Sequence, residues 1–192
     1  TQSALRQYVE RTPNGTEIPD DTFKTRHRGI LAFTVAFLPF VFGISRLQGL
    51  ESVTGAELPA IPLLHSIVGV VLVLAVLVVA ALPQMPRRTG SSLASVGFMI
   101  NASLLAYFTG GFIEAHFLYF VGVGVVALYE DWVPFVITIG YVAIQHSVFG
   151  LMEWFTVYNH QAAMANPIVW GGIHGLGVLM LAGAITFLWQ SL

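Results

Sequence analysis

The sequence predicts an all-α membrane protein, a polytopic bundle of six transmembrane helices with both termini in the cytoplasm. Of its 192 residues, 56% are hydrophobic and only 9% are charged, whereas soluble domains carry about 25% charged residues. A bilayer core of about 30 Å needs about 20 apolar residues per helix. Six apolar segments come close to that length, and they lie near 29–47, 62–82, 92–109, 111–129, 133–152 and 168–190.

Short polar or turn-forming stretches separate these segments and predict where helices start. Ser91 or Ser92 is expected to cap the third helix, because serine side chains accept from free backbone N–H groups. The glycines in "TGG" (109–111) predict a tight turn between the third and fourth helices. We expect Asp131 to cap the fifth helix, with Pro134 in its first turn.

The positions of lysine and arginine predict the orientation, because these residues concentrate in cytoplasmic loops. Seven precede the first helix or lie between the second and third, whereas only Arg46 lies on the opposite side. We therefore expect both termini in the cytoplasm and the chain in the plasma membrane. Residues 1–28 are predicted to form a cytoplasmic N-terminal arm. Residues 29–192 are predicted to form a six-helix domain that precedes a cytoplasmic signalling region.

The histidines form the main functional signal. At about 1.5 Å per residue, four of them lie near the outer ends of four different helices, namely His65, His116, His146 and His174. His160 lies in the last outer loop. Polar groups inside a membrane are costly and usually functional. A single such histidine is best explained by an interhelical hydrogen bond, but four at one depth predict a shared ligand.

The choice of ligand lies between haem and a bare metal ion, because imidazole binds zinc, copper, iron and haem. Gly171, three residues before His174, and Trp170 share faces with the histidines, and small residues can open a flat slot between helices. Ordinary close helix packing explains the glycine equally well. The pattern favours haem b, and the alternative is a zinc or copper site built from His116, His146, His160 and His174.

Glu114 lies two residues from His116 and therefore faces about 160° away from it around the helix. It is expected near the outer mouth of the bundle. There it could contact Tyr158 or His160, orient a ligand imidazole, or meet haem propionates. A carboxylate that simply reaches the membrane interface is an equal alternative.

The motifs "GGFIEAHFLYFV", "LYEDWVPF", "QHSVFG", "VYNH" and "PIVWGGIHG" occur in this order within residues 100–180. As a set they resemble a six-helix membrane sensor module at the N-terminus of some chemotaxis transducers and cyclic-di-nucleotide enzymes. The haloarchaeal form resembles the haem-containing oxygen transducer of aerotaxis. Members often carry two adjacent histidines where this chain has Gln145 and His146. The resemblance implies that the site residues are Glu114, His116, His146, His160 and His174.

The expected function is therefore that of a haem b sensor in a signal transducer, responding to oxygen, another diatomic gas or a redox partner. Two of the four helix histidines would ligate the iron, and the resemblance implies a homodimer. The alternative is a zinc or copper sensor, or a metal-dependent membrane hydrolase that uses Glu114 as its acid/base. No short hydrolase motif supports an enzyme. A net charge of −2 argues against a nucleic-acid partner.

Overall fold

The computed structural model describes residues 13–15, 17–51, 55–152 and 156–191. Within them the chain forms an antiparallel bundle of long helices, and the predicted all-α fold is confirmed. The long helices are α2 (Asp20–Ile44), α3 (Leu63–Ala80), α4 (Arg87–Phe108), α5 (Ile113–Val126), α6 (Trp132–Val148) and α8 (Pro167–Ser191). The short ones are η1 (Ala127–Tyr129), η2 (Phe149–Leu151) and α7 (Gln161–Ala165).

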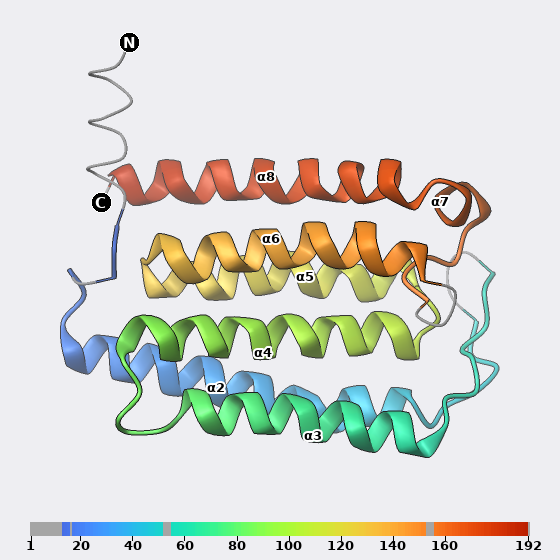
Figure 1. The fold of residues 1–192 in the computed structure, drawn as a ribbon, viewed down its shortest axis with the longest axis horizontal. Coiled ribbons are helices and arrows are strands. Elements are labelled where there is room, and N and C mark those ends of the chain that lie inside the picture. Colours follow the sequence, from blue (N-terminus) through green and yellow to red (C-terminus); the bar gives the residue numbers. More distant parts are fainter. Residues whose placement is uncertain (1–12, 16, 52–54, 153–155, 192) are drawn as a thin grey trace, which may run out of the picture.

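The helices stack in layers, with α8 on one side, α5 and α6 next, then α4, and α2 with α3 on the other side (Figure 1). Helix α4 is the centre of the bundle: it packs against α2, α3, α5 and α6. Its most apolar window is 67% buried, whereas that of α8 is only 17% buried. The start of α2 and the end of α8 lie at the same end of the bundle (Figure 1).

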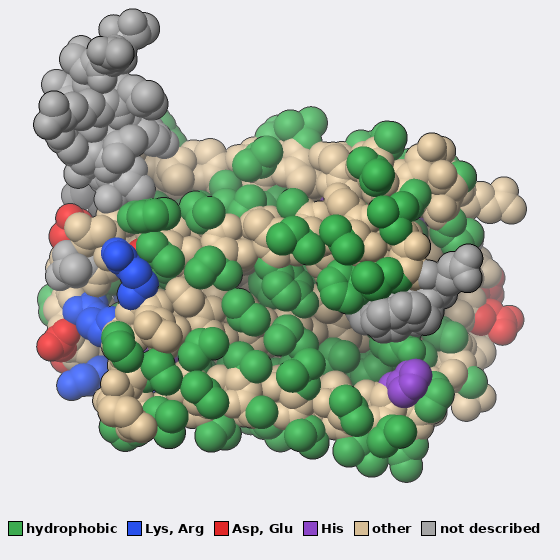
Figure 2. All heavy atoms as spheres, in the orientation of Figure 1, with side chains coloured by type: hydrophobic (Ala, Val, Ile, Leu, Met, Phe, Trp, Pro, Cys, Tyr) green, Lys and Arg blue, Asp and Glu red, His purple; other side chains and the backbone are tan. Residues whose placement is uncertain are grey.

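The surface is that of a multi-pass membrane protein. Among the described residues, five helices are long and apolar enough to cross a bilayer, and the shorter apolar stretch Ile113–Tyr129 makes the sixth. Large apolar side chains such as Met180 and Phe187 of α8 are more than 70% exposed. Hydrophobic side chains cover the middle of the bundle, and charged side chains gather at its ends (Figure 2). Which end faces the cytoplasm stays a prediction.

Two helices begin earlier than the sequence predicts. Helix α2 starts at Asp20 and not near residue 29, so residues 20–28 of the predicted arm are helical, while residues 1–12 and 16 lie outside the described part. Asp20 and Asp21 in the first turn stabilise this start by interacting with the helix dipole. The hydropathy pattern missed these turns because they are polar.

Helix α4 starts at Arg87, directly after Pro86, so the predicted cap at Ser91 or Ser92 is wrong. The Ser91 hydroxyl instead donates to the carbonyl of Arg88 inside the helix. At α6 the predicted cap is confirmed: a carboxylate oxygen of Asp131 accepts from the backbone N–H of Val133 at 2.9 Å.

Candidate metal-binding site

Three of the predicted histidines meet at the end of the bundle opposite to the start of α2 and the end of α8. His116 comes from the first turns of α5, His146 from the last turn of α6, and His174 from the second turn of α8. One ring nitrogen from each lies within 4.8 Å of the others. The ring centroids are 4.7 to 5.3 Å apart. We call His116, His146 and His174 the histidine trio.

Each ring of the trio is held by the same backbone contact. The Nδ1 atoms lie 2.8 to 2.9 Å from the carbonyl oxygens four residues earlier, at Phe112, Val142 and Trp170. A carbonyl oxygen only accepts, so Nδ1 carries the proton in each neutral ring. The lone pair is thereby left on Nε2, the atom that can bind a metal. This anchoring orients all three rings before any ligand arrives.

The Nε2 atoms of His116 and His146 are buried and make no hydrogen bond to any described residue. The backbone of Val157 approaches the His116 ring without completing one. A buried polar atom without a partner costs about 1–3 kcal/mol. Two such atoms within 4.8 Å of each other form a place where a ligand could bind.

Gly171 permits the close approach of α8 to α6 that brings His174 to His146. A Cβ at Gly171 would lie 2.6 Å from the Ser147 hydroxyl oxygen, 3.2 Å from the Ser147 backbone nitrogen and 3.3 Å from the His146 carbonyl carbon. The sequence predicted Gly171 as a site residue, and the structure gives it a packing role. It sets the distance between two helices that carry histidines of the trio.

Two tyrosines enclose the trio. Tyr158, in the segment before α7, lies with its ring parallel to that of His116, at 6.1 Å and 5°. Its hydroxyl donates to the His146 carbonyl at 3.1 Å. Burial raises the pKa of Tyr158 to about 12, which keeps this phenol protonated. On the other side, the Tyr119 ring lies 4.8 Å from that of His146, and its hydroxyl donates to Ser103 at 3.1 Å.

The trio fits a single metal ion better than a haem. In a tetrahedral site with metal–nitrogen bonds near 2.0–2.1 Å, the nitrogens are about 3.3 Å apart. Even if every pair in the trio were 4.8 Å apart, each nitrogen would need to move only by about 0.8 Å to reach that geometry. A haem plane between two axial rings would instead require them to separate, because centroid distances near 5 Å indicate direct ring contact.

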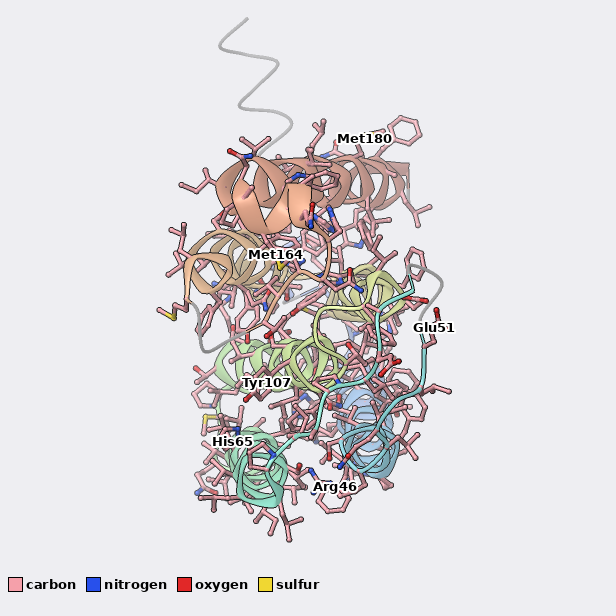
Figure 3. All side chains as sticks on the ribbon, turned by 90° about the vertical axis from the view of Figure 1, so that its right-hand side faces the viewer. Arg46, Glu51, His65, Tyr107, Met164 and Met180 are labelled. Atoms are coloured by element: carbon pink, nitrogen blue, oxygen red, sulfur yellow. The ribbon has the colours of Figure 1, made fainter. Side chains whose placement is uncertain are left out.

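The structure does not bring His65 to the trio. His65 is exposed on the first turn of α3, and its Nδ1 lies 2.8 Å from the Tyr107 hydroxyl. Figure 3 shows His65 and Tyr107 together on the α3 side of the bundle. Helix α3 packs against α4 and α2, so α4 stands between His65 and the other histidines. The sequence placed His65 at the same membrane depth as the trio, but side chains at equal depth need not lie close together.

His160 and Trp170 lie beside the trio without joining it. His160 caps α7: its Nδ1 accepts from the backbone N–H of Ala163 at 3.4 Å. Its ring contacts that of Trp170 edge-on, with centroids 4.5 Å apart. The Trp170 carbonyl accepts from His174. These two residues therefore support the loop and the start of α8 next to the trio.

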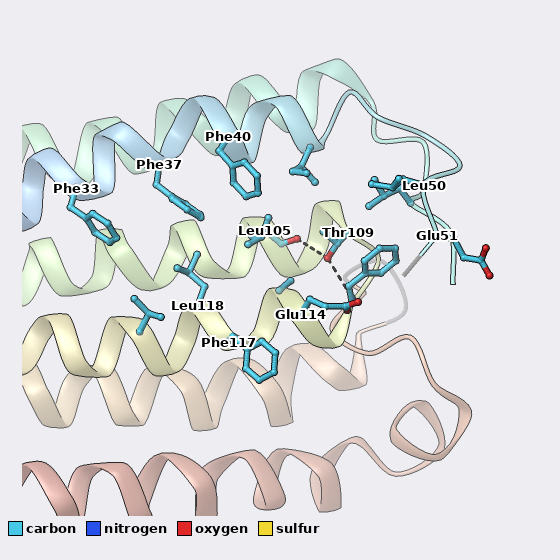
Figure 4. A pocket seen from close by; sticks show the side chains of 15 residues that line it. Phe33, Phe37, Phe40, Leu50, Glu51, Leu105, Thr109, Glu114, Phe117 and Leu118 are labelled. Atoms are coloured by element: carbon cyan, nitrogen blue, oxygen red, sulfur yellow. Dashed lines mark hydrogen bonds between the residues drawn. The ribbon is translucent and has the colours of Figure 1, made fainter. Parts of the chain in front are cut away.

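Glu114 faces away from the trio, as its spacing from His116 predicts. It lies in the first turn of α5 and lines a pocket of ≈ 570 Å³ between α2 and α5. Phe33, Phe37 and Phe40 form the α2 wall of this pocket (Figure 4). Glu114 thus belongs to another surface of α5.

Sequence reasoning missed the central position of Tyr158. Its ring lies 5.9 to 6.1 Å from all three rings of the trio. The only available signal was its place in the motif "VYNH". Gly111 of the "TGG" turn, at φ 83°, lets the Tyr158 backbone pass where a Cβ would come within 2.6 to 2.8 Å of it.

The sequence is 43% identical over 190 residues to the transducer protein Htr8 of Halobacterium salinarum, a match that covers 98% of this chain. The chain spans 30% of the length of that relative. No family model matches the sequence, and no solved structure matches it. The resemblance to haloarchaeal transducers, predicted from motifs within residues 100–180, is confirmed and extends over almost the whole chain.

Proposed function

We propose that this chain is the membrane sensor domain of a signal transducer, and that it reads its signal through one transition-metal ion bound by His116, His146 and His174. The similarity to a transducer supports signalling over catalysis. The single observation that carries the metal assignment is the arrangement of the trio. Its Nδ1 atoms are all tied to the backbone, and its ring nitrogens converge within 4.8 Å.

Three imidazole donors are suited to zinc and copper. They leave a coordination position open, as in catalytic zinc sites with three protein ligands. If the ion were copper, a diatomic gas such as oxygen would bind Cu(I) at that position, or an external redox partner would change the oxidation state of the copper; zinc, which has no redox chemistry, would not bind oxygen. Either event changes the distances that the metal prefers between the three nitrogens.

Helix α8 is the element that would carry this change away from the site. It contributes His174, it is the least buried of the candidate spans, and it runs to the end of the bundle where α2 begins. A ligand can shift an equilibrium only through a difference in affinity for two states. The metal would bind more tightly when α8 lies at one distance from α5 and α6 than at another. This difference in affinity would shift α8 towards the first position.

The proposal is tested by measuring metal content and absorption of the purified protein. We expect one zinc or copper ion per chain, with no Soret band. Substituting His116, His146 or His174 by alanine should each weaken metal binding by more than about 100-fold, since even indirect partners of metal ligands contribute 10–100-fold. Substituting His65 by alanine is the matched control and should leave metal binding unchanged.

The haem prediction competes directly with this proposal. A stoichiometric Soret band that shifts with dithionite would overturn the metal assignment, and its loss on substitution of two histidines would identify the axial pair. A protein without metal or haem, with the same affinity for added zinc and copper in wild type and in the trio variants, would overturn both.

A further inference from the structure

We propose a binding site for the phosphate headgroup of an anionic lipid at the end of the bundle where α2 and α4 begin. The site is a pocket of ≈ 650 Å³ between the first turns of α2 and the connection from α3 to α4. It lies on the opposite end of the bundle from the histidine trio. The lining residues used below are Asp20, Phe23, Lys24, His27, Arg28 and Arg87.

The pocket has a basic mouth. Lys24 and Arg28, one helical turn apart on α2, both line it and are exposed. No hydrogen bond or ion pair joins either of them to another described residue. Arg26 and Arg88, on the same end, are instead paired with Glu130 at 2.6 Å and Asp131 at 3.0 Å. Lys24 and Arg28 are therefore the cations available to an external anion.

The third cation of the pocket is fixed in place. Arg87 donates to Asp20 at 2.9 Å and to the Ile18 carbonyl at 3.0 Å, and its guanidinium lies 4.4 Å from the Phe23 ring centroid. Arg87 is also the first residue of α4, and this helix begins without a side-chain cap. The positive end of that helix dipole adds to the field of Lys24 and Arg28 at the mouth.

The rest of the pocket lining is largely apolar. His27 uses both ring nitrogens internally, on the Tyr129 hydroxyl at 2.8 Å and the Ala80 carbonyl at 3.1 Å. The apolar lining includes Leu31, Ala80 and Leu82. Val78 and Val79, in the last turn of α3 before the pocket-lining Ala80, are 62% and 42% exposed.

Basic groups above an apolar wall fit an amphiphile, with its phosphate at Lys24 and Arg28 and its acyl chain along α2 and α3. Free phosphate would contact only Lys24 and Arg28 at the mouth of the pocket and would leave the apolar wall empty. Basic pockets at the cytoplasmic ends of membrane helices bind anionic headgroups in this way, with each cation near the surface contributing about fivefold in affinity.

Native mass spectrometry of the detergent-purified chain tests the site. We expect dioleoylphosphatidylglycerol to bind more tightly than dioleoylphosphatidylcholine. The double variant Lys24→Gln/Arg28→Gln should weaken phosphatidylglycerol binding by roughly 30-fold. Arg26→Gln removes one charge from the same helix end outside the pocket and should have little effect. Both variants should retain the metal content of the wild type, which separates this result from the proposed function.

Three outcomes would overturn the lipid site. These are equal binding of the two lipids, unchanged phosphatidylglycerol binding in the double variant, and full competition by millimolar inorganic phosphate. The last would assign the mouth to free phosphate.

Discussion

Replacing Gly171 by alanine tests whether the spacing of α8 against α6 sets the metal site. The added Cβ would lie 2.6 Å from the Ser147 hydroxyl oxygen, about 0.8 Å inside an ordinary contact of 3.4 Å. That oxygen can rotate away. The contacts at 3.2 Å and 3.3 Å are with backbone atoms of Ser147 and His146, and they can be relieved only if α8 retreats by a few tenths of an ångström.

The expected change in the free energy of unfolding of Gly171→Ala is the sum of two opposing effects. Overpacking costs about 1–3 kcal/mol, and the better helix propensity of alanine returns up to about 1 kcal/mol. Gly172, the next residue, is the matched control, because a Cβ there meets nothing within 4 Å. Gly172→Ala should be neutral or stabilising. Gly171→Ala should be less stable than Gly172→Ala by about 1–3 kcal/mol.

Metal affinity gives the second readout, because the retreat of α8 displaces His174 from His116 and His146. We expect about a tenfold loss of affinity in Gly171→Ala, in the range seen for groups that position metal ligands. Thermal unfolding and competition with a chelating dye measure the two effects. Adding Ser147→Ala should recover part of the loss by removing the closest contact. Equal stability and affinity in Gly171→Ala and Gly172→Ala would refute the reasoning.

Substitutions at three further positions test other parts of the structure. Tyr158→Phe removes the hydrogen bond to the His146 carbonyl and should lower the free energy of unfolding by about 1 kcal/mol, as measured by thermal denaturation; an unchanged value would show that water replaces the phenol. Asp131→Ala removes the cap of α6 and the partner of Arg88 and should cost about 1–2 kcal/mol, whereas Asp131→Asn, which keeps a capping oxygen, should cost less. His65→Phe should leave metal content unchanged, and a loss would place His65 in the site despite its contact with Tyr107.

Hydropathy predicted the fold because a membrane helix must be long and apolar whatever its neighbours are. The six helices appear where the apolar segments predict them, and the starts of α2 and α4 are the exceptions. At these starts Asp20 and Pro86 decide the boundary through local backbone effects, which an apolar window does not register.

The site was only partly predictable for a different reason. Depth along a helix follows from sequence position, so the layer of histidines could be located. Which helices are neighbours does not follow from depth, and α4 separates His65 from the trio. The position of Tyr158 depends on the path of a loop past Gly111, which no periodic pattern encodes.

The geometry of α8 decides what kind of motion the site can transmit. His174 lies near one end of this helix, and near the other end the Trp189 ring packs on that of Phe135 with centroids 4.9 Å apart. The two residues are separated by about 22 Å along the axis. If the Trp189 contact acts as a pivot, a displacement of about 0.8 Å at His174, the movement a metal would require, tilts α8 by about 2°. A stiff helix with little buried surface can tilt without repacking the centre of the bundle around α4, whereas a slide along its axis would have to break the contacts at both ends. If the proposed metal binds at the trio, it would therefore signal most easily by tilting α8.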